Sequence, residues 1–208
     1  MCGNGGRCAL DFAFSKMFEF SPKSELFFTM ANSQYYGSAH EQGIKLVLPP
    51  PIGVAPNMKI IPNDMQISGT YVDVGSDHFV INHDDLVQFG VGFDKMSINS
   101  FAPSVRYHDK FGKKGVNVNI YKRNGDAISL ITYERGVEFV TGACGTGAIS
   151  TAMHCIIAHS QKMPVMIYPP SGIPLFVEFT KDANDNIENS ILIGHSEIVR
   201  RDILKLSI

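Results

Sequence analysis

Two short segments of this chain carry the same arrangement of residues. Residues 2–5 read Cys-Gly-Asn-Gly, and residues 144–147 read Cys-Gly-Thr-Gly. Each segment places one cysteine directly before a Gly-x-Gly turn, and an apolar stretch with helical spacing follows each turn. The sequence therefore predicts two helices that both begin beside a cysteine, in a fold that contains the same unit twice.

A helix that begins beside a thiol has a definite chemistry. Its first turn presents unpaired N–H groups and the positive end of the helix dipole, which together attract anions and stabilise a thiolate. Two such helix starts that face each other would hold one carboxylate between the sulfurs of Cys2 and Cys144. One sulfur can then take a proton from one face of a carbon while the other returns a proton to the opposite face. This arrangement predicts an amino-acid racemase or epimerase with both cysteines as catalytic residues.

The two helices are expected to differ in how they are covered. The first, at 7–18, has apolar positions that include Cys8, and its Arg7 lies four residues before Asp11, where the two can pair. The second, at 148–159, is apolar almost all round and therefore belongs in a core.

The rest of the chain reads mostly as strands bounded by Gly, Pro, Asn or Asp. The expected strands are 25–30, 34–40, 43–48, 70–75, 78–82, 115–122, 127–133, 163–168, 174–180, 190–194 and 196–201. The Asn-Gly pair at 124–125 predicts a hairpin between two of them. The three prolines at 49–51 cannot lie in a central strand, and they mark the best boundary between domains.

Composition excludes several classes of protein. Of the 208 residues 44% are hydrophobic and 18% charged, and the net charge is −2. These values fit a globular protein of one domain or two small ones and give no reason to expect a nucleic-acid partner. No run of eighteen apolar residues is present, so we expect no membrane span. The four cysteines are expected to be free thiols, with Cys8 and Cys155 in the core, and no ligand spacing predicts a metal.

Removal of an α-proton leaves carbanion character beside a carboxylate, and this charge needs stabilisation. The sequence shows no motif for a pyridoxal lysine and no metal cluster, so we expect no cofactor. Backbone N–H donors fixed where the charge develops are the remaining means. The expected donors are the amides of Gly3, Asn4, Gly145 and Thr146.

Four segments of the chain resemble one known family. Residues 1–8 (MCGNGGRC) and 134–148 (ERGVEFVTGACGTGA) resemble the two signature segments of the diaminopimelate epimerases. Between them, 72–78 (VDVGSDH) resembles that family's V-D-x-G-N-P-H stretch, and 115–119 (GVNVN) resembles its asparagine-containing strand. The segments occur in the family's order along essentially the whole chain.

The resemblance implies an α+β fold of two pseudo-symmetric domains, each a mostly antiparallel sheet around a central helix, with the active site in the cleft between them. Residues 1–50 would be the remnant of an incomplete first domain, rejoined by 196–208, and 51–195 would be the second domain. The implied activity is cofactor-independent conversion of LL-2,6-diaminopimelate to the meso form, for lysine and peptidoglycan synthesis. The implied protein is a cytoplasmic isomerase with a small-molecule substrate, and a homodimer is compatible with it.

The resemblance also assigns roles to further residues. His78 and Glu134 would lie near the thiols and bias which sulfur is ionised, although a lone histidine is often structural. Glu134 and Arg135 would clamp the distal zwitterion of the substrate, or else form a solvated surface pair. Asn117 would contact the substrate or satisfy a buried structural bond. Ser76 would take the place of an asparagine contact.

The chain departs from the family pattern at several places. Ser76 replaces an asparagine, Asp77 replaces a proline and Val140 replaces a glutamate. The family also carries a long segment before its first catalytic cysteine, so we expect a fragment or a late reading frame, aggregation-prone and nearly inactive by itself. Two alternatives stay open beside the epimerase: a proline or hydroxyproline racemase relative, and an inactive truncated chain.

Overall fold

The computed structural model describes residues 2–16, 24–30 and 33–197. In this part of the chain the helices are α1 (Gly3–Lys16), α2 (Lys95–Arg106) and α3 (Gly145–His159). The strands are β1 (Glu25–Met30), β2 (Ser33–His40), β3 (Gly43–Leu48), β4 (Gly53–Ile60), β5 (Ile67–Asp73), β6 (Asp77–Asn82), β7 (Asn117–Asn124), β8 (Ala127–Tyr133), β9 (Val165–Tyr168), β10 (Leu175–Lys181) and β11 (Ile187–Gly194).

The eleven described strands form one sheet in the order β1-β2-β3-β11-β10-β9-β8-β7-β6-β5-β4. Neighbouring strands are antiparallel except for β6 with β7 and β8 with β9, which are parallel. The chain leaves β3 at 49–52 and resumes in β4 at the far edge of the sheet, and β11 later returns to pair with β3. The predicted α+β class with a mostly antiparallel sheet is confirmed.

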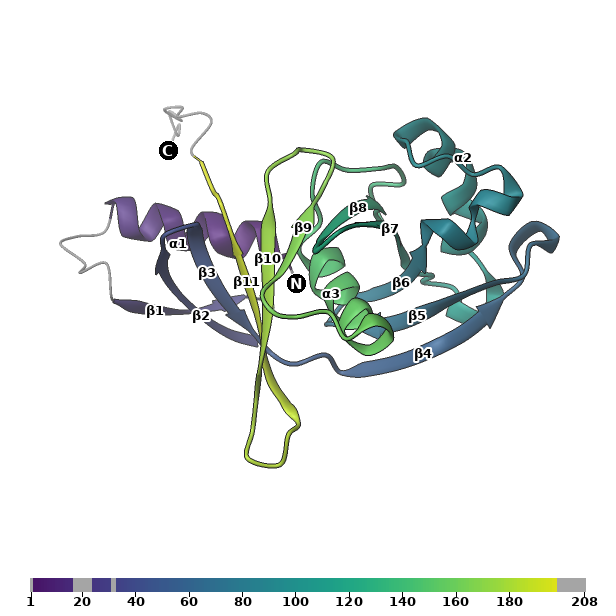
Figure 1. Cartoon of the computed structure of the whole chain (residues 1–208). Helices are drawn as coiled ribbons and strands as arrows, with labels where there is room; N and C mark the ends of the chain where they lie inside the picture. The colour runs from purple at the N-terminus through teal and green to yellow at the C-terminus, as the bar shows by residue number, and fades with distance from the viewer. Residues whose placement is uncertain (1, 17–23, 31–32, 198–208) are drawn as a thin grey trace.

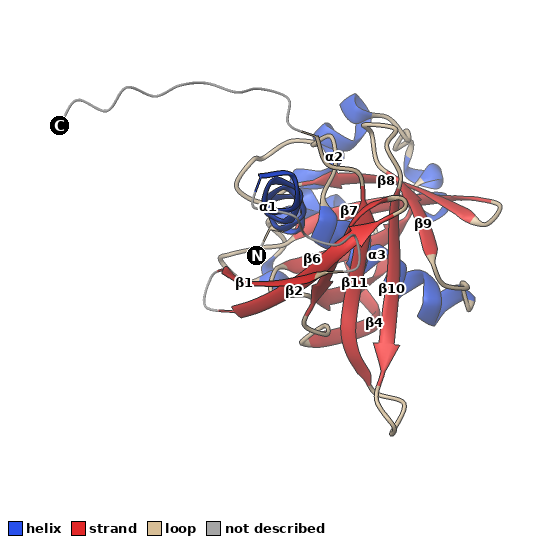
Figure 2. Ribbon diagram, turned by 90° about the vertical axis from the view of Figure 1, so that its left-hand side faces the viewer, coloured by secondary structure: helices blue, strands red, loops and turns tan. Residues whose placement is uncertain are grey.

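Helices α1 and α3 lie on one face of this sheet and α2 lies on the other. Val80 of β6 packs in one core with Leu10 of α1 and Ile149 of α3. The neighbouring Phe79 points to the other face, into a second core with Ile98 of α2. Helix α1 contacts β2 and β3, whereas α3 contacts the strands from β5 to β11, so these two helices pack on different parts of the sheet (Figure 1). Strands β10 and β11 run between the two halves, and their hairpin projects beyond the other strands (Figures 1 and 2).

The face of α1 that contacts the sheet differs from the prediction. A Cβ on Gly6 would lie 2.9 Å from Leu46 of β3, so Gly6 and Leu10, four residues apart, face the sheet. Cys8 lies on the other side of the helix and is exposed, so its prediction as a core residue was wrong. Arg7 is buried, and within the described residues it forms no ion pair with Asp11.

Helix α3 fits its prediction better. It begins at Gly145, three residues before the predicted start. It is buried along most of its length, as its apolar sequence requires, and Cys155 on it is fully buried. Within the described residues, none of the helices combines the length and apolar character that a membrane crossing needs.

Most strand predictions are confirmed, three of them with unchanged bounds: 25–30, 43–48 and 127–133. Asn124 and Gly125 form the β7–β8 hairpin turn, where Gly125 has φ 62°. The expected strand at 196–201 falls mainly outside the described residues, and 196–197 are not in a strand. Strand β4 was missed because its range follows the three prolines and contains a fourth.

Helix α2 was also missed, because it contains Pro103 and several weak helix formers. Its signals are nevertheless present in the sequence. Asp94 caps its start by accepting a hydrogen bond from the Ser97 amide. Its buried positions, Ile98, Phe101, Ala102 and Val105, have helical spacing.

Candidate active site

The two predicted helix starts meet in the structure. A Cβ built on Gly3 would lie 3.4 Å from the Cα of Gly145, and a Cβ on Gly145 would lie 3.3 Å from the Cα of Gly3. Each added Cβ would also come within 2.9 Å of a methyl carbon of Leu192 on β11. Glycine at both positions therefore allows the backbones of α1 and α3 to approach this closely.

The two cysteines occupy equivalent places at these helix starts. The sulfur of Cys2 accepts a hydrogen bond from the Gly5 amide at 3.3 Å. The sulfur of Cys144 accepts one from the Gly147 amide at 3.4 Å, also three residues ahead. Each sulfur thus caps its own helix as a serine oxygen would. They differ in exposure, because Cys2 is exposed and Cys144 is 7% exposed.

The remaining amides of the first turns are available to a ligand. Within the described part of the chain, the amides of Gly3, Asn4, Gly145 and Thr146 donate to no protein acceptor. These four are the donors predicted from the sequence. Because two positive helix ends point at one place, this junction favours a carboxylate or an enolate-like oxygen.

A side chain also links the two starts. The amide nitrogen Nδ2 of Asn4 donates to the carbonyl oxygen of Ala143 at 3.0 Å. Ala143 directly precedes Cys144, so this bond fixes the second cysteine's loop to the first turn of α1. The side chain of Asn4, a residue predicted to bind the substrate, therefore already donates to a protein acceptor through its Nδ2.

Cys144 is held as a thiol rather than a thiolate. Burial, together with the charge and a hydrogen bond of the Glu134 carboxylate, raises its pKa to about 12. The hydrogen bonds from Gly147 and Thr146 act in the opposite direction and are outweighed. The helix start alone predicted a stabilised thiolate, but burial and Glu134 prevail at this cysteine. The Thr141 hydroxyl donates to Glu134 and so holds its carboxylate in place.

His78 is completely buried on β6. Its Nδ1 pairs with Nδ2 of Asn119 on β7 at 3.0 Å, so with the amide donating, the proton of the neutral ring is on Nε2. Burial lowers the pKa of His78 to about 3, which keeps the ring neutral. Among the described residues its Nε2 has no hydrogen-bond partner.

Unpaired polar atoms also gather behind the start of α3, and sequence reasoning missed them. A Cβ on Gly147 would lie 2.8 Å from Oδ1 of Asn119 and 2.9 Å from Oγ1 of Thr132. Within the described residues these two oxygens have no hydrogen-bond donor. A signal existed in the alternation of β7, since Asn117 and Asn119 point to the same side of the strand.

Asn117 is at the centre of a polar network at the ends of three strands. Its Nδ2 donates to Oγ of Ser76 at 2.9 Å and to the carbonyl oxygen of Asp77 at 2.8 Å. Its Oδ1 accepts from the backbone amide of Arg135 at 2.9 Å. The structural role weighed for Asn117 is therefore present, and Ser76 is one of its partners.

The Arg135 guanidinium is paired within the protein. Its Nη1 donates to Oδ2 of Asp77 at 2.7 Å and to the Gly115 carbonyl oxygen at 3.1 Å. The other oxygen of Asp77 accepts from the Tyr71 hydroxyl at 2.6 Å. Tyr71 and Arg135 both lower the pKa of Asp77 and outweigh its partial burial. Glu134 and Arg135 are neighbours in sequence, but their side chains have different partners.

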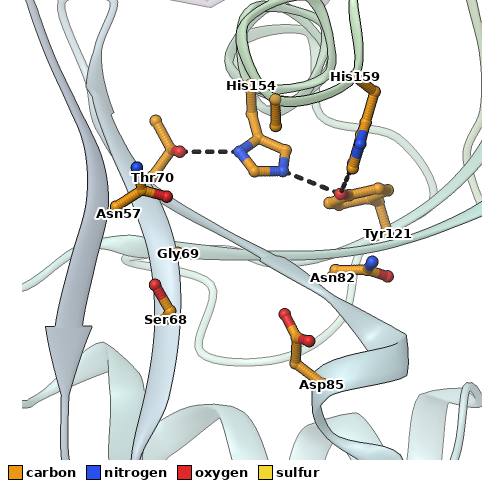
Figure 3. A pocket seen from close by; sticks show the side chains of 10 residues that line it. Asn57, Ser68, Gly69, Thr70, Asn82, Asp85, Tyr121, His154 and His159 are labelled. Atoms are coloured by element: carbon orange, nitrogen blue, oxygen red, sulfur yellow. Dashed lines mark hydrogen bonds between the residues drawn. The ribbon is translucent and has the colours of Figure 1, made fainter.

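A separate polar cavity of about 240 Å³ lies toward the other end of α3 (Figure 3). His154 there bonds to the Thr70 hydroxyl at 2.8 Å and to the Tyr121 hydroxyl at 2.9 Å. Tyr121 also bonds to His159 at 2.8 Å. None of the predicted site residues lines this cavity. Among the described residues, no three His, Cys, Asp or Glu side chains are grouped to hold a metal ion.

Comparison with known proteins finds proteins of similar sequence and fold. No protein-family model matches the chain. A diaminopimelate epimerase of Aquifex aeolicus is 31% identical over 189 residues, which are 89% of this chain and 64% of that protein. A diaminopimelate epimerase of Hydrogenobaculum is 34% identical over 186 residues, 88% of this chain and 64% of that protein. The chain thus spans slightly less than two thirds of the length of these curated relatives.

Solved structures share the fold. A hydroxyproline epimerase from Agrobacterium vitis matches with a TM-score of 0.63 at 16% identity, over 92% of this chain and 63% of that one. A probable proline racemase from Agrobacterium radiobacter matches with a TM-score of 0.67 at 14% identity, over 96% and 68%. In sequence the chain is thus similar to diaminopimelate epimerases, and it shares its fold with the epimerase and racemase structures.

Proposed function

We propose that this protein is an isomerase that inverts the α-carbon of an amino acid by two-cysteine acid/base catalysis, without a cofactor. The proposed reaction converts LL-2,6-diaminopimelate to the meso form, as in lysine and peptidoglycan precursor synthesis. The observation that carries the proposal is the contact of two helix starts, each with a cysteine cap and two unpaired amides.

In this mechanism the substrate carboxylate binds the free amides of Gly3, Asn4, Gly145 and Thr146. The sulfur of Cys2, as thiolate, takes the α-proton, so an S–H bond forms as the C–H bond breaks. The electron pair left on carbon is stabilised through the carboxylate by the amide donors. Cys144, a thiol because of its burial and Glu134, donates its proton to the opposite face of the carbon. The reverse reaction exchanges the two roles.

Residues around the two cysteines would tune the thiols or hold the substrate. Glu134 keeps Cys144 protonated and receives a hydrogen bond from Thr141. His78 presents an unpaired Nε2–H in a dry environment. Arg135 contacts the distal end of the substrate, and Asn117 together with Ser76 holds Arg135 at its backbone amide.

The organisation of the whole protein follows the same proposal. We propose that residues 1–50 and 51–195 belong to two domains, the first rejoined by 196–208, with substrate bound where α1 meets α3. The four free thiols fit a reducing compartment, and we propose the cytoplasm. Strands β1 and β4 are at the two ends of the described strand order, where a second copy can pair to form a homodimer.

The test uses the purified protein with LL-2,6-diaminopimelate in deuterated water. The wild type should place deuterium at the inverted carbon, and Cys2→Ala and Cys144→Ala should each abolish epimerisation. A Cys144→Ala variant with near wild-type turnover would contradict the mechanism. Cys155→Ala is a matched control, because Cys155 is buried in α3 away from the helix start.

The same assay with L-proline and 4-hydroxyproline tests the racemase alternative. Its support is the shared fold of the two Agrobacterium proteins. Turnover of proline in the absence of turnover of diaminopimelate would replace the proposed substrate but keep the two-cysteine chemistry. The absence of exchange with either substrate would favour the inactive chain.

A further inference from the structure

Arg7 is a buried cation that has no acidic partner among the described residues. It is 5% exposed, and within the described residues it belongs to no ion pair. Its Nη2 donates to Oδ1 of Asn4 at 3.1 Å and its Nη1 to the Gly3 carbonyl oxygen at 3.5 Å, while its Nε has no acceptor. Burial lowers its pKa, yet a guanidinium stays charged near neutral pH. Buried arginines are normally paired, so this one calls for an anion.

The guanidinium lies at the start of α1. Its bond to the Gly3 carbonyl, four residues back, folds the side chain over the first turn. On the other side it meets β11, where a Cβ on Gly194 would lie 3.5 Å from its Nε. The charge of Arg7 therefore adds to the positive end of the α1 dipole, in the turn that Cys2 caps. A negative sulfur at Cys8 or Cys2 in turn favours the charged form of Arg7.

Arg7 also belongs to a chain of bonds that crosses the helix junction. Asn4 accepts from Arg7 through Oδ1 and donates to the Ala143 carbonyl through Nδ2. Since both ends of the Asn4 amide group are engaged, its orientation is set by Arg7 on one side. The bonds connect the cation to the residue before Cys144.

We propose that Arg7 is a positioning residue of the two-thiol site, which stabilises the anionic sulfur of Cys2 by charge and holds the two helix starts together through Asn4. The inference rests on the proposed two-cysteine function for its catalytic meaning. The effects of Arg7 on the reactivity of the Cys2 thiol and on the contact between the two helices do not depend on which substrate binds.

The charge effect is tested by alkylation of Cys2 with iodoacetamide. A Cys8→Ser background removes the other exposed thiol. At about pH 7, Arg7→Met should slow alkylation about fivefold, because a lost positive charge lowers the thiolate fraction. Arg7→Lys keeps the charge and should stay within about twofold. At strongly alkaline pH the alkylation rates of the three proteins should converge, because a nearby charge then no longer limits the thiolate fraction.

Equal rates for the parent, Arg7→Lys and Arg7→Met at neutral pH would overturn the charge effect. Circular dichroism and thermal melting check that each variant is folded. If Arg7→Met does not fold, Arg7→Gln replaces it, because a glutamine amide can still donate to Asn4 without carrying charge. A purely structural arginine would change the melting temperature but leave the pH dependence of alkylation unaltered.

The route through Asn4 is tested by a double-mutant cycle on α-proton exchange with diaminopimelate. Arg7→Lys should lower kcat about tenfold with little change in KM, because it loses the forked contact that aligns the junction. In an Asn4→Ala background the same change should have little further effect. Fully additive losses would overturn this route. If the wild type shows no exchange, the proposed function fails, whereas the alkylation result still decides the charge effect.

Discussion

Gly3 and Gly145 touch across the two helix starts, where a Cβ added to Gly3 would lie 3.4 Å from the Cα of Gly145. Each glycine directly follows a cysteine, so their contact brings Cys2 and Cys144 to equivalent places on either side of the junction. The free amides of both first turns meet there as well. The contact of these two glycines is therefore the condition for any chemistry that uses both sulfurs on one ligand.

The first prediction concerns this contact. Alanine normally stabilises a helix relative to glycine, but Gly145→Ala would force its Cβ against Leu192 and Gly3. We expect the free energy of unfolding to fall by about 1–3 kcal/mol, the usual range for overpacking. Epimerisation should fall more than tenfold, about 1.4 kcal/mol in transition-state energy. Urea denaturation and the exchange assay measure the two effects.

Gly53→Ala is the control for this change, because a Cβ at Gly53 meets no atom within 4 Å. It should leave both stability and turnover near the wild-type values. A Gly145→Ala variant as stable and active as Gly53→Ala would show that the helix starts can separate without loss.

The second prediction concerns the protonation of Cys144. Its pKa is raised to about 12, first by burial and then by Glu134. Glu134→Gln removes a negative charge, so the pKa of Cys144 should fall and its alkylation should begin at lower pH. Mass spectrometry of the alkylated peptide across a pH series follows this change. Glu138→Gln, four residues away and paired with Arg106, should not move the profile of Cys144.

The third prediction concerns stability in acid. Burial lowers the pKa of His78 to about 3 and that of His154 to about 4, from ordinary values of 6.5. Between about pH 6.5 and 4 the unfolded chain therefore binds more protons at these positions than the folded chain does. The free energy of unfolding should be highest above about pH 6.5 and should fall with pH, down to about pH 4 for the His154 part and about pH 3 for the His78 part.

Urea unfolding at several pH values measures this loss. His154→Gln should reduce the slope of the free energy of unfolding against pH in that window, because one histidine with a lowered pKa is removed. An unchanged slope in His154→Gln would mean that His154 titrates alike in both states.

The fourth prediction separates two roles of Arg135. If Arg135 contacts the distal end of the substrate, Arg135→Ala should reduce kcat/KM about 30-fold or more. This corresponds to a loss of about 2–5 kcal/mol in transition-state stabilisation. Asp77→Asn removes its charged partner but keeps the guanidinium, so turnover should fall much less. The pair is partly exposed, and its own contribution to stability should be about 0–1 kcal/mol. Steady-state kinetics and urea unfolding of both variants decide this; equal losses of kcat/KM would assign Arg135 a structural role only.

Local features of the chain were predictable from the sequence. Capping, turn preference and apolar spacing act over a few residues, so they revealed the helix starts after Cys2 and Cys144, the hairpin at 124–125 and most strands. The same signals were weaker in α2, where Asp94 and the spaced apolar residues compete with Pro103. The resemblance of four short segments was enough to indicate the family that the comparisons support.

Contacts between distant parts of the chain were decided only by the tertiary structure. Whether Cys8 or Arg7 faces the sheet depends on how Gly6 fits against β3, which no periodicity within α1 contains. The pairing of Arg135 with Asp77 depends on β6 and β7 lying side by side.

Local sequence signals indicate that two cysteines begin two helices, and they favour a proton-transfer site at these helix starts. Packing brings the two starts into contact, buries the Cys144 thiol while leaving Cys2 exposed, and encloses Arg7 with no carboxylate beside it among the described residues. The physical reason is that capping and helix propensity are local, whereas burial and charge environment are set by residues that packing brings together from far apart in the chain.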